Sequence, residues 1–121
     1  MKIILNHFSG GKKDLLEACK YSFMACDLGV TEGCLNAGVC LSEGVGGLPR
    51  SIQDSLPYLN KACDASNNIA CMKLFNLYIS PQEKGSSWNR DPVKAFEYAK
   101  RACDGNDILG CLNASRQCNI G

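Results

Sequence analysis

Apolar and small residues recur at helical spacing in three stretches of the chain, and polar or Gly/Asn-rich segments separate these stretches. In the clearest of them, residues 91–103, the apolar and small positions are Ala95, Phe96, Tyr98, Ala99, Ala102 and Cys103. The stretch opens with Asp91-Pro92, which has the form of an N-cap residue followed by proline at the first helical position. The pattern predicts helices and indicates an all-α protein.

The three stretches are copies of one repeat. Each copy contains the tripeptide Ala-Cys-Asp and a second cysteine eight residues after the first, which gives the pairs Cys26/Cys34, Cys63/Cys71 and Cys103/Cys111. A tyrosine stands five residues before each first cysteine, at Tyr21, Tyr58 and Tyr98. Successive copies begin 37 and 40 residues apart, and such a period is typical of a solenoid.

Each copy predicts two helices joined by a short turn. The residues twelve positions before the first cysteines, Asp14, Ser51 and Asp91, are candidate N-caps of the first helices. Pro57 would then lie inside the second copy's helix, where proline is costly, so we expect that helix to start late, with Asp54 as its cap. Gly and Asn in the turns can adopt the left-handed backbone found at helix ends. The second helix follows, with a small residue before its cysteine that permits close helix approach.

The sequence therefore predicts an α-solenoid of about three αα-hairpins and six helices. We expect a single domain over residues 1–121, with repeats at about 12–47, 48–88 and 89–121. Residues 1–11 have the character of a remnant of a preceding repeat.

Nine cysteines in 121 residues are unusual for a cytosolic domain. The hairpin turn brings the two cysteines of a pair side by side, at a separation that suits the Cα spacing of a disulfide. We therefore expect three disulfides, one in each repeat. Two alternatives stay open, namely buried apolar cysteines in a reduced solenoid and a zinc site, although the chain lacks a Cys-x-x-Cys pair and has a single histidine.

Three cysteines, Cys19, Cys40 and Cys118, have no partner at the repeat spacing. Cys19 occupies the position of Leu56 and Phe96 in the other copies, so we expect free thiols that serve as apolar core residues. A thiol-disulfide carrier that uses one of these three cysteines is an alternative function.

Charge and motifs exclude several function classes. The chain has 13 Lys and Arg against 12 Asp and Glu, without the basic field of a nucleic-acid binder, and it contains no apolar run of membrane-spanning length. It also has no phosphate-binding loop or metal-ligand cluster, and its Ser-x-x-Lys match at residues 9–12 lacks Ser-Asp-Asn and Lys-Thr-Gly partners. We therefore expect no catalytic residue, no cofactor and no metal. Candidate contacts to a polypeptide partner lie in the second helices and loop ends, at Asn36, Lys73, Trp88, Asn113 and Arg116.

The repeats resemble the Sel-1-like repeats, relatives of the tetratricopeptide repeats, and in particular their disulfide-bridged members. The resemblance rests on Ala18–Gly29, on Arg101–Gly105 and on Cys111–Arg116, together with the repeated Ala-Cys-Asp framework. It implies a right-handed superhelical stack and structural disulfides at the three pairs. The chain has about three repeats where more are expected of such a protein, as in a fragment or a shortened relative.

The function that the resemblance implies is a non-enzymatic, protein-binding scaffold. It would assist the assembly of a mitochondrial respiratory complex, cytochrome c oxidase, in the intermembrane space, with assembly intermediates as polypeptide partners. The alternative that the resemblance leaves open is a secreted or periplasmic bacterial-type protein with ligand-binding or weak hydrolytic activity.

Overall fold

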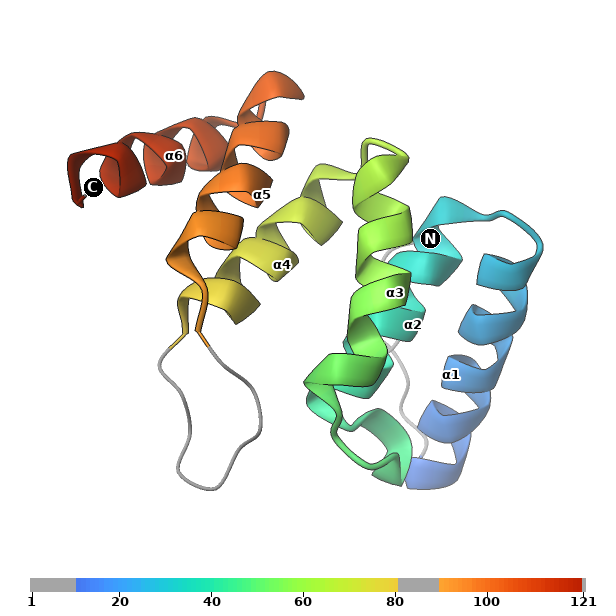
Figure 1. Ribbon diagram of the computed structural model, residues 1–121. Coiled ribbons are helices and arrows are strands. Elements are labelled where there is room, and N and C mark those ends of the chain that lie inside the picture. The colour runs from blue at the N-terminus through green and yellow to red at the C-terminus, as the bar shows by residue number, and fades with distance from the viewer. Residues whose placement is uncertain (1–10, 81–89, 121) are drawn as a thin grey trace. The chain divides into compact units, whose positions relative to one another are not determined.

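The computed structural model describes residues 11–80 and 90–120, and within these ranges the chain is helical (Figure 1). The α-helices are α1 (Lys12–Asp27), α2 (Thr31–Glu43), α3 (Ile52–Asp64), α4 (Asn68–Ile79), α5 (Pro92–Asp104) and α6 (Ile108–Ile120). A short 3₁₀ turn, η2 (Val45–Gly47), follows α2. The all-α fold and the six helices that the sequence predicts are confirmed.

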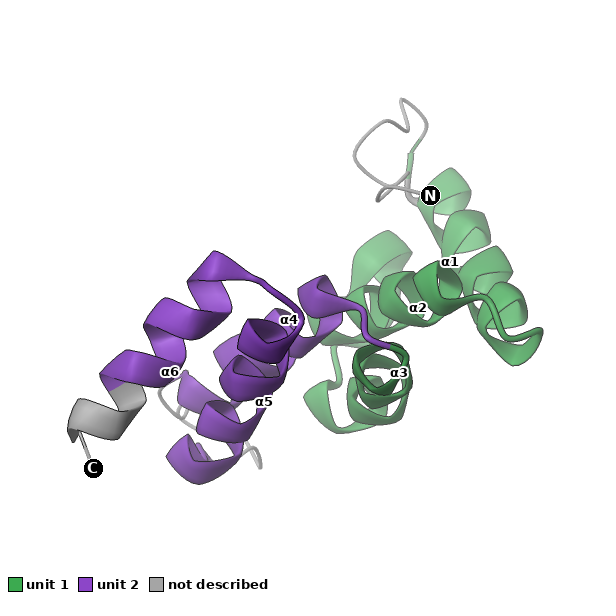
Figure 2. Cartoon of the chain, turned by 90° about the horizontal axis from the view of Figure 1, so that it is seen from above, with its two compact units in different colours: residues 1–65 green, residues 66–121 purple. Residues whose placement is uncertain are grey.

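The chain forms two compact units, Met1–Ala65 and Ser66–Gly121 (Figure 2). The interpretation of residues 1–121 as a single domain stays a prediction. In the first unit α2 packs against both α1 and α3, and η2 packs on α1. Residues 33–40 of α2 are all buried, so this helix is the centre of the unit. In the second unit α5 packs against both α4 and α6, and Tyr78 of α4 stacks on Tyr98 of α5 with ring centroids 5.6 Å apart.

The three helix-to-helix turns share one backbone geometry. The same position of each turn has a positive φ, at Gly29 (φ 90°), Ser66 (φ 69°) and Asn106 (φ 68°). In the turn after α1 the amide of Val30 donates to the carbonyl of Ala25, and in the turn after α5 the amide of Asp107 donates to that of Ala102. The left-handed backbone expected of the turn residues is therefore present, and in the second copy a serine adopts it.

Helix starts agree with the expected caps in α5 but not in α1 or α3. Asp91 caps α5 by accepting from the amide of Lys94, and Pro92 follows at the first helical position. The expectation that Asp54 caps α3 is wrong, because Ser51 accepts from the Asp54 amide and the helix starts at Ile52. Pro57 thus lies inside α3. The carbonyl that this proline leaves without an amide partner belongs to Gln53, which is exposed, so water can satisfy it.

The expectation that Asp14 caps the first helix is also wrong. The N-cap of α1 is Gly11, which forms no side-chain capping bond, and Asp14 lies within the first turn. A carboxylate there still stabilises the helix through the macrodipole, so the acidic residue was placed correctly near the start and assigned the wrong role.

Two hairpins depend on a glycine at the start of their second helix. A Cβ on Gly33 would lie 2.6 Å from the Cβ of Ala25 and 2.8 Å from the amide nitrogen of Cys26. A Cβ on Gly110 would lie 2.7 Å from the Cβ of Ala102 and 2.8 Å from the amide nitrogen of Cys103. The near-identical distances indicate that the α1–α2 and α5–α6 hairpins pack in the same way, with the close approach that the sequence predicts.

Candidate protein-binding surface

Two disulfides join α1 to α2 in the first unit. Cys26, near the end of α1, is bonded to Cys34 in the first turn of α2, with a Cα–Cα distance of 4.4 Å. This is the bond that the eight-residue spacing predicts. A second bond joins Cys19 to Cys40, with a Cα–Cα distance of 6.0 Å. All four cysteines are buried, with exposed fractions of 0–1%.

The Cys19–Cys40 bond corrects the expectation of free thiols at these positions. Cys19 precedes Cys26 by seven residues and Cys40 follows Cys34 by six. In two antiparallel helices joined at Cys26 and Cys34, positions two turns away from the tip on either side lie opposite one another. That near-symmetric spacing was readable in the sequence and could have identified the bond. Because both sulfurs are in this bond, neither Cys19 nor Cys40 has the free thiol that the alternative function, a thiol-disulfide carrier, would use.

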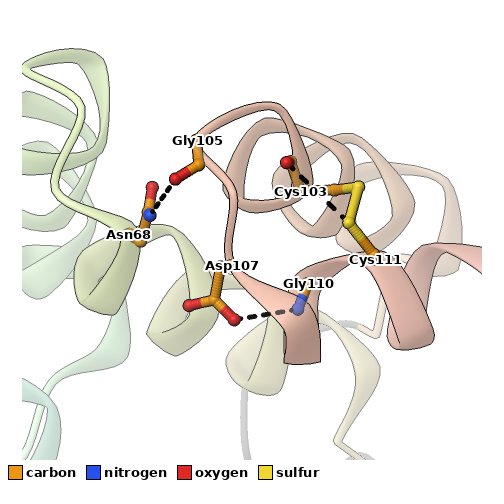
Figure 3. Close-up of a disulfide and its surroundings, with 6 residues drawn as sticks. All are labelled: Asn68, Cys103, Gly105, Asp107, Gly110 and Cys111. Carbon is orange, nitrogen blue, oxygen red and sulfur yellow. Dashed lines mark hydrogen bonds between the residues drawn. A yellow bond between two sulfur atoms is a disulfide. The ribbon is translucent and has the colours of Figure 1, made fainter.

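In the second unit Cys103 near the end of α5 is bonded to Cys111 in α6, again with a Cα–Cα distance of 4.4 Å (Figure 3). Cys63 and Cys71 are disulfide-bonded as well, and their pairing with each other stays a prediction. Cys118 belongs to α6, but its side chain lies outside the described residues. The two bonds with the eight-residue spacing thus share one geometry at the tips of the first and third hairpins.

The residues expected to contact a partner lie in different environments. Asn36 is buried, with an exposed fraction of 2%, and its Oδ1 has no hydrogen-bond partner among the described residues. It therefore does not present a surface contact, because its position in α2 faces the packed interior of the unit. Lys73 and Asn113 are half-buried and Arg116 is exposed. Trp88 lies outside the described residues.

The first helix and its C-cap residue, Leu28, carry exposed apolar side chains that sequence reasoning missed. Tyr21, Met24 and Leu28 follow one another at intervals of three and four residues, so they share one side of the helical path. Their exposed fractions are 67%, 58% and 83%. We call these three residues the α1 apolar face.

The corresponding positions of α3 contact the preceding repeat. Tyr58, the repeat equivalent of Tyr21, packs against Phe23 of α1 with ring centroids 5.4 Å apart. Lys61, the equivalent of Met24, donates from Nζ to the carbonyl of Cys26 at 3.4 Å. This side of α3 thus contacts the preceding repeat, whereas the same side of α1 is exposed. The sequence signal was the apolar Met24 at a position where the other copies have Lys61 and Arg101.

Polar interactions fix the turn of the last hairpin. Asn68 at the start of α4 donates from Nδ2 to the carbonyl of Gly105 at 2.9 Å, and Asp107 accepts from the amide of Gly110 at 3.1 Å (Figure 3). A Cβ on Gly105 would meet the Asn68 amide. In each unit a backbone carbonyl at the end of a first helix therefore accepts a hydrogen bond from a neighbouring repeat: from the following repeat at Cys26 and from the preceding repeat at Gly105.

Within the described ranges, no helix combines the length and apolar character needed to cross a membrane. The described side chains likewise include no group of three or more His, Cys, Asp or Glu residues arranged to hold a metal ion.

Comparison with known proteins relates this architecture to relatives. A cytochrome c oxidase assembly factor 7A from Xenopus laevis is 29% identical over 112 residues, covering 89% of this chain and 47% of the relative. A cytochrome c oxidase assembly factor 7 from Xenopus tropicalis is 27% identical over 106 residues, covering 86% of this chain and 46% of the relative. The chain thus spans about half the length of the curated relatives that it matches.

Among solved structures, a Sel1 repeat protein from Oxalobacter formigenes has the same fold. It superimposes with a TM-score of 0.63 at 24% sequence identity, covering 78% of this chain and 36% of that protein. The family model of the Sel1 repeat matches three segments, residues 6–30, 31–67 and 82–107, which together make up most of the chain. The α-hairpins, their cysteine framework and this match lead to one conclusion: the chain belongs to the Sel1 repeat family.

Proposed function

We propose that this chain is a non-enzymatic scaffold that binds polypeptide partners through the α1 apolar face. The observation that carries the proposal is the contrast between α1 and α3. On α3, this side is occupied by contacts to the preceding repeat through Tyr58 and Lys61. On α1 and at its C-cap, Tyr21, Met24 and Leu28 are more than half exposed. Burying such side chains stabilises a complex by about 1.5–3 kcal/mol each before the costs of association.

The partner expected at this face is a helix with an apolar side. The side of α3 that corresponds to the α1 apolar face contacts residues of a helix, Phe23 and Cys26 of α1, in the first unit. In a helix-in-groove or helix-on-helix contact, the helix packs through apolar side chains spaced by three and four residues. Aromatic and methionine side chains such as Tyr21 and Met24 are also among those enriched at interface centres.

The process that we propose for this scaffold is assembly of cytochrome c oxidase in the mitochondrial intermembrane space. The two Xenopus relatives are named as cytochrome c oxidase assembly factors, which supports a role of this kind. The disulfides in both units support an oxidising compartment. In this proposal the chain binds assembly intermediates and carries out no chemistry itself.

A co-purification experiment from mitochondria tests the proposal. The tagged chain is compared with the variant M24K/L28A, which gives α1 the residues that α3 and its turn carry at 61 and 65 and should therefore fold. We expect the wild-type chain to recover oxidase subunits or assembly intermediates, and the variant to recover at least tenfold less.

The matched control is V93K, which places a lysine at an apolar position of α5 that is 70% exposed and lies outside the α1 apolar face. It should recover partners as the wild type does. Absence of oxidase components from the wild-type sample would contradict the assembly role. Equal recovery with M24K/L28A would contradict the assignment of the surface.

A further inference from the structure

We infer that the Cys103–Cys111 disulfide is a site of thiol-disulfide exchange with an external dithiol, and that its reduction releases α6 from α5. The four bonded cysteines of the first unit are 0–1% exposed. Cys111, in contrast, is exposed and Cys103 is partly exposed. Because a thiolate must reach one sulfur of the bond in order to attack it, access separates this disulfide from the other two whose partners are described.

The first hairpin provides an internal comparison. The Cys26–Cys34 bond has the same sequence separation of eight residues and the same Cα–Cα distance of 4.4 Å as the Cys103–Cys111 bond. Both join the end of a first helix to the start of a second helix. Because the two bonds close loops of equal length, the comparison between them isolates the burial of their cysteines.

The described side chains of α6 are less buried than those of α2. Among its residues 108–116, only Gly110 is buried, and Asn113 and Ala114 are half-buried. The other six are exposed, including the apolar side chains of Ile108, Leu109 and Leu112 at 76%, 64% and 51%. In α2, by comparison, residues 33–40 are all buried. Because α6 buries fewer of its described side chains than α2 does, we expect its attachment to α5 to depend more on the disulfide.

The exchange proceeds in two balanced steps. A thiolate of the dithiol attacks Sγ of Cys111, the more exposed of the two residues, so that a mixed disulfide forms while the Cys103–Cys111 bond breaks and Cys103 leaves as the thiolate. The second thiol of the reagent then attacks its own bonded sulfur, closes an external disulfide and releases the Cys111 thiolate. Cys111 is the fourth residue of α6, and a position near a helix N-terminus stabilises the departing thiolate. Two electrons pass from the dithiol to the protein bond.

The test is time-resolved reduction of the oxidised chain with dithiothreitol at pH 7, followed by acid quenching, alkylation and peptide mapping. We expect Cys103 and Cys111 to be alkylated at least ten times faster than Cys26 and Cys34. Equal rates, or earlier alkylation of Cys26 and Cys34, would overturn the inference. A Cys118→Ser background prevents reshuffling with the remaining cysteine.

Hydrogen exchange tests the release of α6. After selective reduction, amides of residues 112–116 should exchange at least tenfold faster, while those of α2 keep their protection. The variant C103S/C111S should show the same change in α6 without any reductant, and C26S/C34S should leave α6 protection unchanged. Unaltered exchange in α6 after selective reduction would refute the release, whatever the alkylation rates.

Discussion

Gly46 illustrates how much a single missing side chain can matter in this protein. Its backbone is left-handed (φ 68°), and a Cβ there would lie 2.6 Å from the backbone nitrogen of Leu16 in α1. Gly29 is also left-handed (φ 90°), but a Cβ on it would meet nothing within 4 Å. We predict that G46A lowers the free energy of unfolding by about 3 kcal/mol, because backbone strain and overpacking add.

The matched variant G29A should cost only about 1 kcal/mol, the strain alone, since Ser66 and Asn106 adopt this conformation in the other turns. Urea unfolding of both variants measures the difference. Equal losses would mean that η2 does not pack closely on α1.

Tyr78 gives the protein a predicted sensitivity to alkaline pH. Burial raises the pKa of this phenol above 10.0, and the nearby Asp91 carboxylate raises it further. The unfolded chain releases the proton near pH 10, so stability is full below that value and declines as the pH rises toward the higher pKa of the folded state. We expect Y78F to weaken this decline. Denaturant unfolding between pH 8 and about pH 11 provides the measurement, and identical pH profiles for Y78F and the wild type would contradict it.

At the scale of elements, the start of α5 depends on one side chain. The Asp91 carboxylate accepts from the Lys94 amide at 3.1 Å. We predict that D91A lowers the free energy of unfolding by about 1 kcal/mol at pH 7, as loss of an N-cap typically does. D91N keeps an acceptor and should lie within a few tenths of a kcal/mol of the wild type. Thermal unfolding distinguishes them, and an unchanged D91A would show that Pro92 alone fixes the helix start.

Local patterns predicted the helices well because their signals lie within a few residues. The Ala-Cys-Asp repeats, the turn residues and Asp91-Pro92 identified the helix ends. Local rules failed where tertiary packing decides. Pro57 is tolerated inside α3 because the carbonyl that it leaves without an amide partner belongs to an exposed residue, Gln53. Helix propensity alone does not predict which residues of a helix are exposed to water.

The candidate surface was less predictable than the helices for the same reason. Asn36 was expected at the surface as a polar residue, yet it is buried in α2. Tyr21 was recognised as a repeat position, but its exposure depends on what lies beside α1, which the repeat pattern does not encode. The Cys19–Cys40 bond required the antiparallel geometry of two helices, not only the spacing within one repeat.

At the scale of the molecule, the disulfides differ in the length of chain that they enclose. The Cys19–Cys40 bond spans 21 residues and the Cys26–Cys34 bond spans eight. The chain-entropy account assigns about 3 kcal/mol to the longer loop and somewhat less to the shorter. We predict that C19A/C40A lowers the melting temperature of the first unit more than C26A/C34A does, because all four cysteines are equally buried and the Cys19–Cys40 bond closes the longer loop. Circular dichroism melts test the order, and a smaller loss for C19A/C40A would contradict it.

The two bonds of the first hairpin are nested, since the Cys26–Cys34 loop lies entirely within the Cys19–Cys40 loop. Cleavage of the backbone anywhere in the exposed turn at residues 27–30 therefore leaves both fragments linked by two covalent bonds. A protease that nicks this turn would produce a chain that migrates as one species until it is reduced. The α1–α2 pair could thus survive in a protease-rich compartment with its backbone already cut.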